Sequence, residues 1–258
     1  MNKVAVITGT TSGIGYAFCE RFAREKTDLV LISRNHEKLM IQQDDLQQRY
    51  GISTWSIQQD LGQPGAAQTV YQKLCELNVS VDYLVNNAGF DVSGRFIETD
   101  IEKEKEMIQL NITFITEFTK LLLPEMAAKK SGRILFLGSL VAYTPCALNA
   151  VYSASKAYVL FFSRAIRTEL KGTGVTVTVL CPGATDTNFA ERSGLEGTPS
   201  FNKHVMSADR VADAGYRSMM KGRIKHTPGL YNKIMIFSSK VFPASLADWY
   251  TMRIFTKK

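Results

Sequence analysis

The chain has 258 residues, of which 45% are hydrophobic and 21% are charged, and this composition is typical of one folded α/β domain. Its four cysteines and three histidines are scattered along the sequence. This argues against a disulfide framework, a zinc motif and a Ser-His catalytic pair. No apolar run reaches the roughly 18 residues of a membrane-spanning helix, and the first strand pattern begins at Lys3, so we expect a cytoplasmic protein.

The net charge of +7 is concentrated near the C-terminal end. Residues 217–258 contain nine Lys and Arg but one acidic residue, Asp248. The whole chain has 31 Lys and Arg and 24 Asp and Glu, so the remaining residues are nearly neutral. The excess is local, and a nucleic-acid-binding surface is therefore not expected.

Short apolar runs alternate with helical patterns along the chain. The runs are residues 3–8, 29–33, 54–57, 81–85, 133–137 and 175–180. Strands that alternate with helices form parallel sheets through right-handed crossovers. We therefore predict an α/β protein with a doubly wound Rossmann fold, consisting of a single parallel sheet with helices on both faces and one domain over residues 1–258. Ligands of such sheets bind beyond the carboxyl ends of the strands.

Three glycines, Gly9, Gly13 and Gly15, follow the first predicted strand and precede a helical pattern over residues 16–26. Glycines let the backbone approach a phosphate, and a helix N-terminus favours an anion. A strand, a glycine turn and a helix in this order are what a dinucleotide pyrophosphate requires. The spacing G-x-x-x-G-x-G nevertheless differs from the general dinucleotide fingerprint G-x-G-x-x-G.

The second predicted strand ends in Ser33 and Arg34, where an NAD enzyme usually carries an acidic residue for the ribose 2′-hydroxyl. Ser33 has no charge to repel a 2′-phosphate, and the Arg34 guanidinium is suited to bind one. We therefore predict NADP(H) as the preferred cofactor. NAD(H) is the alternative, in which Arg34 is a solvated surface residue, because the turn at Thr10 to Ser12 has no second basic residue.

Tyr152 and Lys156 are four residues apart within a helical pattern, so they lie on one face of the predicted helix. An ammonium close to a phenol favours the phenolate, so we expect Lys156 to lower the pKa of Tyr152 from about 10 and prepare it for acid/base chemistry. Ser139 directly follows the strand pattern of residues 133–137. At a strand end its hydroxyl would reach the same substrate oxygen as Tyr152.

Together with residues 8–15, 86–89, 182–187 and Asn111, these motifs resemble the short-chain dehydrogenase/reductase family over about residues 3–230. The resemblance implies that Tyr152 is the general acid/base, that Ser139 steadies the substrate oxygen and that Asn111 holds a water against Lys156. It implies no metal. The cofactor contacts that it implies are Gly9, Thr11, Ser12, Gly13, Ile14, Gly15, Ser33, Arg34, Asp60, Leu61, Asn87, Ala88, Gly89, Tyr152, Lys156, Pro182, Gly183, Thr185 and Thr187.

The predicted function is an NADP(H)-dependent oxidoreductase that interconverts a carbonyl and an alcohol on a hydrophobic ketone or aldehyde. We expect residues 188–207 to form a substrate loop. The predicted substrate contacts are Ser139, Tyr143, Cys146, Phe189 and Met206, with Val92 and Leu148 also in the pocket wall. By resemblance, a homodimer or homotetramer would form through helices at about 101–129 and 151–171. One alternative is a non-catalytic NADP-binding regulator.

The tail, residues 229–258, combines apolar and aromatic side chains with Lys233, Lys240, Arg253, Lys257 and Lys258. In one interpretation, its apolar side chains cap the pocket or join a subunit interface. In the other, it forms an interfacial helix with weak contact to anionic lipid, and the protein is a membrane-peripheral reductase of lipid carbonyls.

Overall fold

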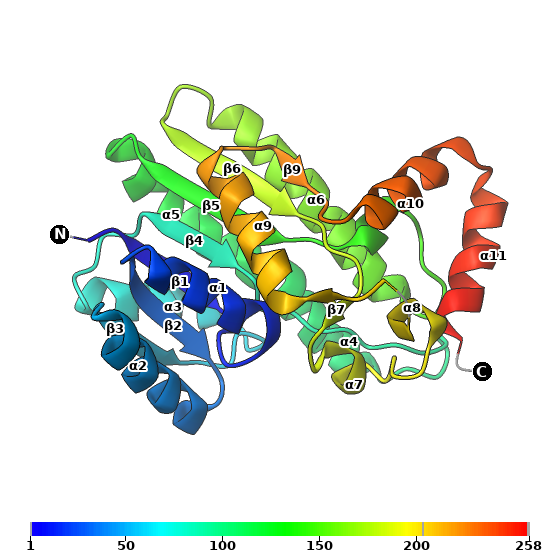
Figure 1. Ribbon diagram of the computed structural model, residues 1–258, viewed down its shortest axis with the longest axis horizontal. Helices are drawn as coiled ribbons and strands as arrows, with labels where there is room; N and C mark the ends of the chain where they lie inside the picture. Colours follow the sequence, from blue (N-terminus) through cyan, green and yellow to red (C-terminus); the bar gives the residue numbers. More distant parts are fainter. Residues whose placement is uncertain (1, 203, 257–258) are drawn as a thin grey trace.

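The computed structural model describes residues 2–202 and 204–256. Within this part of the chain a seven-stranded sheet has the order β3-β2-β1-β4-β5-β6-β9, and all neighbouring strands are parallel (Figure 1). The strands are β1 Val4–Thr8, β2 Asp28–Ser33, β3 Thr54–Gln58, β4 Tyr83–Asn86, β5 Gly132–Leu137, β6 Val175–Leu180 and β9 Lys225–His226. The predicted doubly wound Rossmann fold is confirmed. The short edge strand β9 was not predicted.

The helices cover both faces of the sheet (Figure 1). On one face lie α1 Gly13–Arg24, α2 His36–Tyr50 and α9 Ala208–Met220. The other face carries α3 Ala66–Glu76, α5 Ile115–Ala128 and α6 Ala150–Glu169. A short helix α4, Ile101–Ile108, continues through the π-helical turn η1, Gln109–Phe114, into α5. The single long helical pattern expected from residue 101 is therefore interrupted at Asn111.

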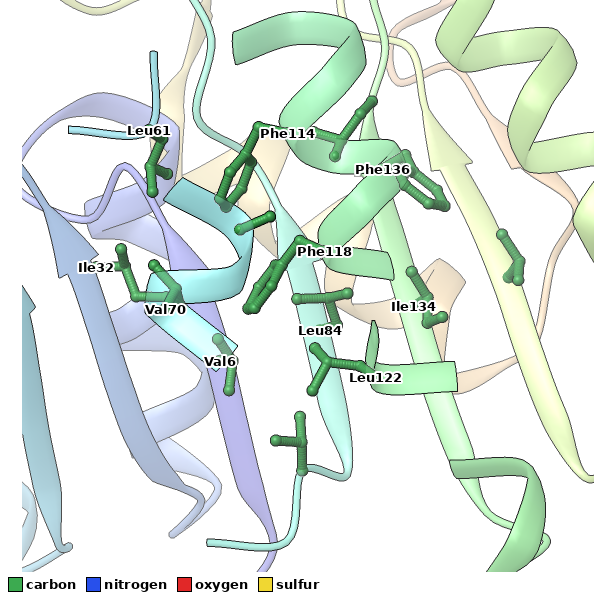
Figure 2. Close-up of a cluster of buried hydrophobic side chains, with 14 of the residues drawn as sticks. Val6, Ile32, Leu61, Val70, Leu84, Phe114, Phe118, Leu122, Ile134 and Phe136 are labelled. Atoms are coloured by element: carbon green, nitrogen blue, oxygen red, sulfur yellow. The ribbon is translucent and has the colours of Figure 1, made fainter. Parts of the chain in front are cut away.

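Two buried apolar clusters hold these layers together. Neighbouring side chains of β1 point to opposite faces, so Val6 belongs to one cluster and Ile7 to the other. Figure 2 shows the first cluster, in which Phe114 and Phe118 lie over Leu84 of β4. The two rings stack with centroids 5.2 Å apart. Because both sheet faces are covered, the strands are almost continuously apolar, as buried parallel strands usually are.

The chain order of the strands reverses between β1 and β4, so the crossover helices depart to opposite sides at this point. The predicted substrate loop lies beyond the strand ends. It includes two short helices, α7 Phe189–Arg192 and α8 Pro199–Asn202. Its ends are joined where β7 Thr185–Asp186 pairs with β8 Met206–Ser207. Ser207 is the N-cap of α9, because its hydroxyl accepts from the Arg210 N–H at 3.4 Å.

The tail forms two helices, α10 Leu230–Val241 and α11 Ala244–Phe255, rather than the single interfacial helix considered above. Phe242 has an extended backbone and Pro243 follows it, which ends α10. In Figure 1 these helices, coloured orange and red, lie at one end of the molecule. No helix of the described chain has the length and apolar character needed to cross a bilayer. Met1, Lys203, Lys257 and Lys258, which belong to the predicted domain, loop and tail, lie outside the described residues.

Candidate active site

The carboxyl ends of the central strands open into a cavity of about 1560 Å³. Every residue predicted to bind the cofactor lines it, from Gly9 after β1 to Thr187 after β7. Four of the predicted substrate residues also line it, namely Ser139, Tyr143, Cys146 and Phe189. The structure thus gathers residues from six parts of the sequence around one space.

The glycine turn is shaped for close backbone approach. Gly9 and Gly13 have positive φ values of 70° and 56°. A Cβ on Gly9 would lie 3.0 Å from the Asn87 side chain, and one on Gly13 would lie 2.9 Å from Thr187. The turn leads into the N-terminus of α1, where Ser12 provides no side-chain cap. Backbone N–H groups at such a helix end are well suited to a pyrophosphate, so this part of the cavity fits a dinucleotide.

The Asn-Asn-Ala-Gly segment after β4 braces this turn. The Asn87 side-chain amide donates to the Thr8 carbonyl at 2.8 Å and to the Gly9 carbonyl at 3.2 Å. In return the Thr8 hydroxyl accepts from the backbone N–H groups of Asn87 and Ala88, at 3.0 and 2.9 Å. These bonds join the ends of the two strands where the strand order reverses.

The end of β2 carries two cationic side chains on the cavity wall, Arg34 and Lys38. Neither makes an ion pair with a carboxylate of the described chain. Lys38 lies in the first turn of α2, where its backbone N–H donates to the Asn35 cap at 2.9 Å. Ser33 shares a 2.9 Å hydrogen bond with Thr11. From the sequence, a second basic residue was considered only in the glycine turn, so Lys38 was not predicted to line the cavity.

Asp60, expected among the cofactor contacts, also shapes its own turn. Its carboxylate accepts from the Gly62 backbone N–H at 3.0 Å and lines the cavity. Leu61 beside it is buried and contributes to the core. The Asp60 side chain therefore both stabilises a turn and forms part of the cavity wall.

Ser139, Tyr152 and Lys156 meet at the end of β5. The Lys156 ammonium is buried and donates to the Leu137 carbonyl at 3.0 Å. It lies 5.6 Å from the centroid of the Tyr152 ring. Ser139 caps the 3₁₀ turn η2, Leu140–Tyr143, and its hydroxyl also bonds the Tyr152 phenol, which favours the phenolate. Burial lowers the pKa of Lys156 to about 8.

The expectation that Lys156 lowers the pKa of Tyr152 is wrong for this structure. The pKa of the phenol is raised well above its ordinary value, because burial disfavours the phenolate and because the Asp91 carboxylate opposes a second negative charge. The opposing effect of the Ser139 hydrogen bond is smaller. Spacing along a helix predicted the pair correctly, but it could not show how deeply the phenol is buried or which acid lies near it.

Asn111 sits in the π-helical turn η1 and does not line the cavity. Its amide nitrogen donates to the Phe90 carbonyl at 3.0 Å and to the Ser155 hydroxyl at 3.2 Å. Its Oδ1 has no hydrogen-bond partner among the described residues. A Cβ on Gly89 would lie 2.9 Å from this oxygen and 3.4 Å from Lys156 Nζ, so both atoms flank the same glycine. π-Turns often occur at functional sites, and this one turns Asn111 toward the lysine.

The substrate end of the cavity is bounded by the loop and the tail. Phe189 packs against Tyr152 with ring centroids 5.7 Å apart, and Phe242, Trp249 and Tyr250 of the tail also form the wall. Met206 is not part of this wall. It pairs with Thr185 between β7 and β8, and its sulfur lies 3.9 Å from the Asn232 side-chain nitrogen.

Sequence reasoning missed two further polar residues in the wall, Asp91 and Asn149. Asp91 was visible as an acidic residue two positions after the Asn-Asn-Ala-Gly motif. Asn149 was visible as a polar residue just before the Tyr152 helix. Only the fold shows that both are buried beside the cavity.

Comparisons with known proteins agree with this geometry. The model of the short chain dehydrogenase family matches residues 3–196, and the chain belongs to this family. It is 33% identical to the ketoacyl reductase HetN of Nostoc sp. over 70% of this chain, although the matched region spans only 63% of that protein. It is also 33% identical to a very-long-chain 3-oxoacyl-CoA reductase of Anas platyrhynchos, over 86% of this chain and 72% of that protein.

Among solved structures, a short-chain dehydrogenase from Sphingobium yanoikuyae in complex with NADPH is 32% identical. The two structures superpose over 89% of each chain with a TM-score of 0.83. The protein is therefore an oxidoreductase of the short-chain dehydrogenase family with a nicotinamide cofactor site.

Replacing Lys156 by Met should stabilise the protein without added nucleotide by about 1–3 kcal/mol at pH 7, because it removes a buried ammonium. Below about pH 8 the lysine is protonated in both folded and unfolded chains, and the folded chain carries the full desolvation penalty. As the pH rises toward 10.5 the folded chain loses its proton first, and the penalty disappears. Urea denaturation at pH 7 and pH 10 should show the difference between the two proteins shrinking. A difference that is independent of pH would contradict the lowered pKa.

Proposed function

We propose that the protein interconverts a carbonyl and an alcohol with NADP(H) and that Tyr152 is its general acid/base. The observation that carries this proposal is the convergence of Ser139, Tyr152 and Lys156 at one point of the cavity whose other end fits a dinucleotide. When bound there, the nicotinamide would supply or accept the hydride. Catalysis by the protein itself then consists of positioning and proton transfer.

In the reductive direction Tyr152 donates its proton to the carbonyl oxygen while the Ser139 hydroxyl steadies that oxygen. The raised pKa of the phenol keeps it protonated at neutral pH, which suits a proton donor. Lys156 then offsets the negative charge that develops on the tyrosine. Asn111 Oδ1, beside Lys156 Nζ across Gly89, is positioned to hold a water that returns the proton.

We further propose that NADP(H) is preferred over NAD(H). Arg34 and Lys38 place two cations, and Ser33 places no carboxylate, at the end of β2, where the adenosine ribose of a Rossmann fold lies. A guanidinium binds a phosphate by charge-assisted and often bidentate hydrogen bonds. The NADPH complex of the Sphingobium relative supports the same preference.

For the substrate we propose a hydrophobic ketone or aldehyde. The wall near Tyr152 is formed by Tyr143, Cys146, Phe189 and aromatic side chains of α11, such as Trp249. Two relatives are named as reductases of ketoacyl or oxoacyl compounds, in which the reacting carbonyl lies on an apolar acyl chain. All four predicted catalytic residues are present, so a non-catalytic NADP-binding regulator is the weaker proposal.

We also propose that the protein is a homodimer or homotetramer in the cytoplasm. Phe161 on α6 is 67% exposed, and Ile101 and Ile108 on α4 are also exposed, so the helices expected to form an interface do carry apolar surface. All four cysteines are free, as is usual in a reducing compartment.

A second candidate is a membrane-peripheral reductase. On α10 the apolar side chains of Leu230, Ile234, Phe237 and Val241 form one exposed stripe, with 73%, 55%, 69% and 62% of their surface accessible. Lys233 and Lys240 flank this tail stripe and are also exposed. An apolar stripe beside lysines fits an anionic lipid surface, and each lysine near such a surface contributes about 1 kcal/mol. Because α10 and α11 also form the cavity wall, docking on lipid would place the pocket next to membrane carbonyls.

Tyr152→Phe should keep the fold and NADPH binding but lower kcat by at least about 10²-fold, the usual contribution of a general acid. Steady-state reduction of a hydrophobic ketone, with circular dichroism and NADPH titration, measures these properties. Tyr158→Phe on the same helix is the matched control, since the Tyr158 hydroxyl bonds Thr116 at 2.8 Å. Comparable activity of Tyr152→Phe and wild type would refute the assignment.

Arg34→Ala should raise the KM for NADPH tenfold or more and leave the KM for NADH nearly unchanged, since a hydrogen bond to a charged group contributes about 1.5–3 kcal/mol. Lys38→Ala should act in the same direction. Initial rates with the two cofactors provide the measurement. Equal losses with NADPH and NADH would show that Arg34 does not bind the 2′-phosphate.

The full-length protein should co-sediment with phosphatidylserine vesicles at low salt and be released at high salt, because salt screens the lysines. The double variant Ile234→Glu, Phe237→Glu should stay in the supernatant. Ile41→Glu, at an equally exposed apolar position on α2, is the control and should still co-sediment. If the wild type remains in the supernatant at low salt, the tail stripe is not a membrane surface.

A further inference from the structure

Asp91 is a buried carboxylate in the cavity wall that the mechanism does not use. Only 4% of its surface is exposed, and neither of its carboxylate oxygens has a hydrogen-bond partner among the described residues. It makes no ion pair within the described chain. Buried carboxylates are normally paired, because an unpaired one is costly to desolvate. Because Asp91 is part of the cavity wall, its unpaired oxygens indicate a partner on the ligand.

The backbone around Asp91 is held in place. Before it, the Phe90 carbonyl accepts from the Asn111 side chain at 3.0 Å. After it, Gly94 N–H and the Ser93 hydroxyl both donate to the Leu148 carbonyl, at 2.8 and 3.3 Å. These bonds tie the segment after β4 to the turn that precedes α6. The carboxylate is therefore fixed beside that turn.

Asn149 in the same turn has equally unused polar atoms. It is 1% exposed, and neither its side-chain oxygen nor its side-chain nitrogen has a partner among the described residues. Its backbone is fixed, because its N–H donates to Cys146 at 3.1 Å and its carbonyl accepts from Ser153 at 2.8 Å. Like Asp91, it lines the cavity. Asp91 and Asn149, which lie on two joined segments, thus both have polar atoms without hydrogen-bond partners and both belong to the wall of the same cavity.

Asp91 interacts electrostatically with the proposed reacting groups. The Asp91 charge raises the pKa of Tyr152 and of Cys146 and favours the charged form of Lys156. Burial raises the pKa of Asp91 itself to about 7, and the charge of Lys156 offsets only part of that effect. Asp91 and Tyr152 line the same cavity, so a substrate whose carbonyl reaches Tyr152 would extend other atoms toward Asp91.

The two side chains together match one functional group. A hydroxyl has a proton to donate and lone pairs that accept, and it pairs with a carboxylate acceptor and with an amide donor at the same time. An ammonium could donate to the carboxylate and to the Asn149 amide oxygen, but it would be repelled by the Lys156 cation. A purely apolar group would leave four buried polar atoms unsatisfied.

We propose that Asp91 and Asn149 form a subsite for a hydroxyl group that the substrate carries near its reacting carbonyl. The hydroxyl donates to Asp91 and accepts from Asn149, so the preferred substrates are hydroxyketones or hydroxyaldehydes and the reduced products are diols. This inference rests on the proposed carbonyl reduction. It adds one polar requirement to a pocket whose other walls are apolar.

The test compares ketones of matched size that differ in the hydroxyl. The pairs are 2-hydroxyacetophenone with propiophenone and 4-hydroxy-2-butanone with 2-pentanone. Wild-type kcat/KM should favour the hydroxyketone of a pair at least tenfold, because a site built to bond a hydroxyl discriminates against an analogue that lacks it. Asp91→Leu, Asp91→Asn and Asn149→Ala should each lower this ratio about tenfold. Asp44→Asn, an exposed carboxylate of α2, should keep the wild-type ratio.

A binding measurement separates this subsite from the proposed function. The diol 1-phenyl-1,2-ethanediol and the matched alcohol 1-phenyl-1-propanol are titrated by calorimetry into wild type and Asp91→Leu in the presence of NADP⁺. If wild type binds the diol more tightly than the alcohol and Asp91→Leu loses this preference, the subsite is supported even if no ketone is reduced. In that case only the proposal of carbonyl reduction is refuted. Reduction of both ketones with a ratio that is the same in wild type and Asp91→Leu overturns the subsite and leaves the function. No turnover and no preference for the diol overturn both.

Discussion

The hydrogen bond from the Lys156 ammonium to the Leu137 carbonyl fixes helix α6 against the end of strand β5. This contact determines the position of Tyr152, one helical turn away, and brings it beside Ser139 at the same strand end. Burial disfavours the ammonium and lowers its pKa to about 8, so the fold gains little stability from the charge itself.

The sheet and most of its helices could be predicted from the sequence, because burial on both faces leaves continuous apolar runs such as the one in β6. The elements that were missed are short and depend on tertiary contacts. Strand β9 has two residues and exists only by pairing with β6. The helices α7 and α8 have four residues each, which is too short for a recognisable period. The π-turn at Asn111 keeps the helical pattern and changes only its hydrogen bonding.

The predicted cofactor residues all reached the cavity because parallel strands bring their carboxyl ends to one edge, and this follows from chain order alone. The pKa of Tyr152 could not be predicted in the same way. The direction of its pKa shift depends on how far the phenol is buried and on the charge of Asp91, which is distant in sequence. The prediction that Met206 contacts the substrate was wrong for a similar reason, since Met206 pairs with β7 and is not part of the cavity wall. Residues fixed by topology were predictable, whereas residues fixed by loop packing were not.

Unsatisfied buried polar groups are few in most folded proteins, because each one costs stability. Here several of them gather around one cavity: Asp91, Asn149 and Tyr143 line it, and Asn111 lies just behind it. A fold selected only for stability would pair or remove these groups. The polar part of the cavity wall therefore differs from the part formed by loop and tail, which includes aromatic side chains such as Phe189 and Trp249.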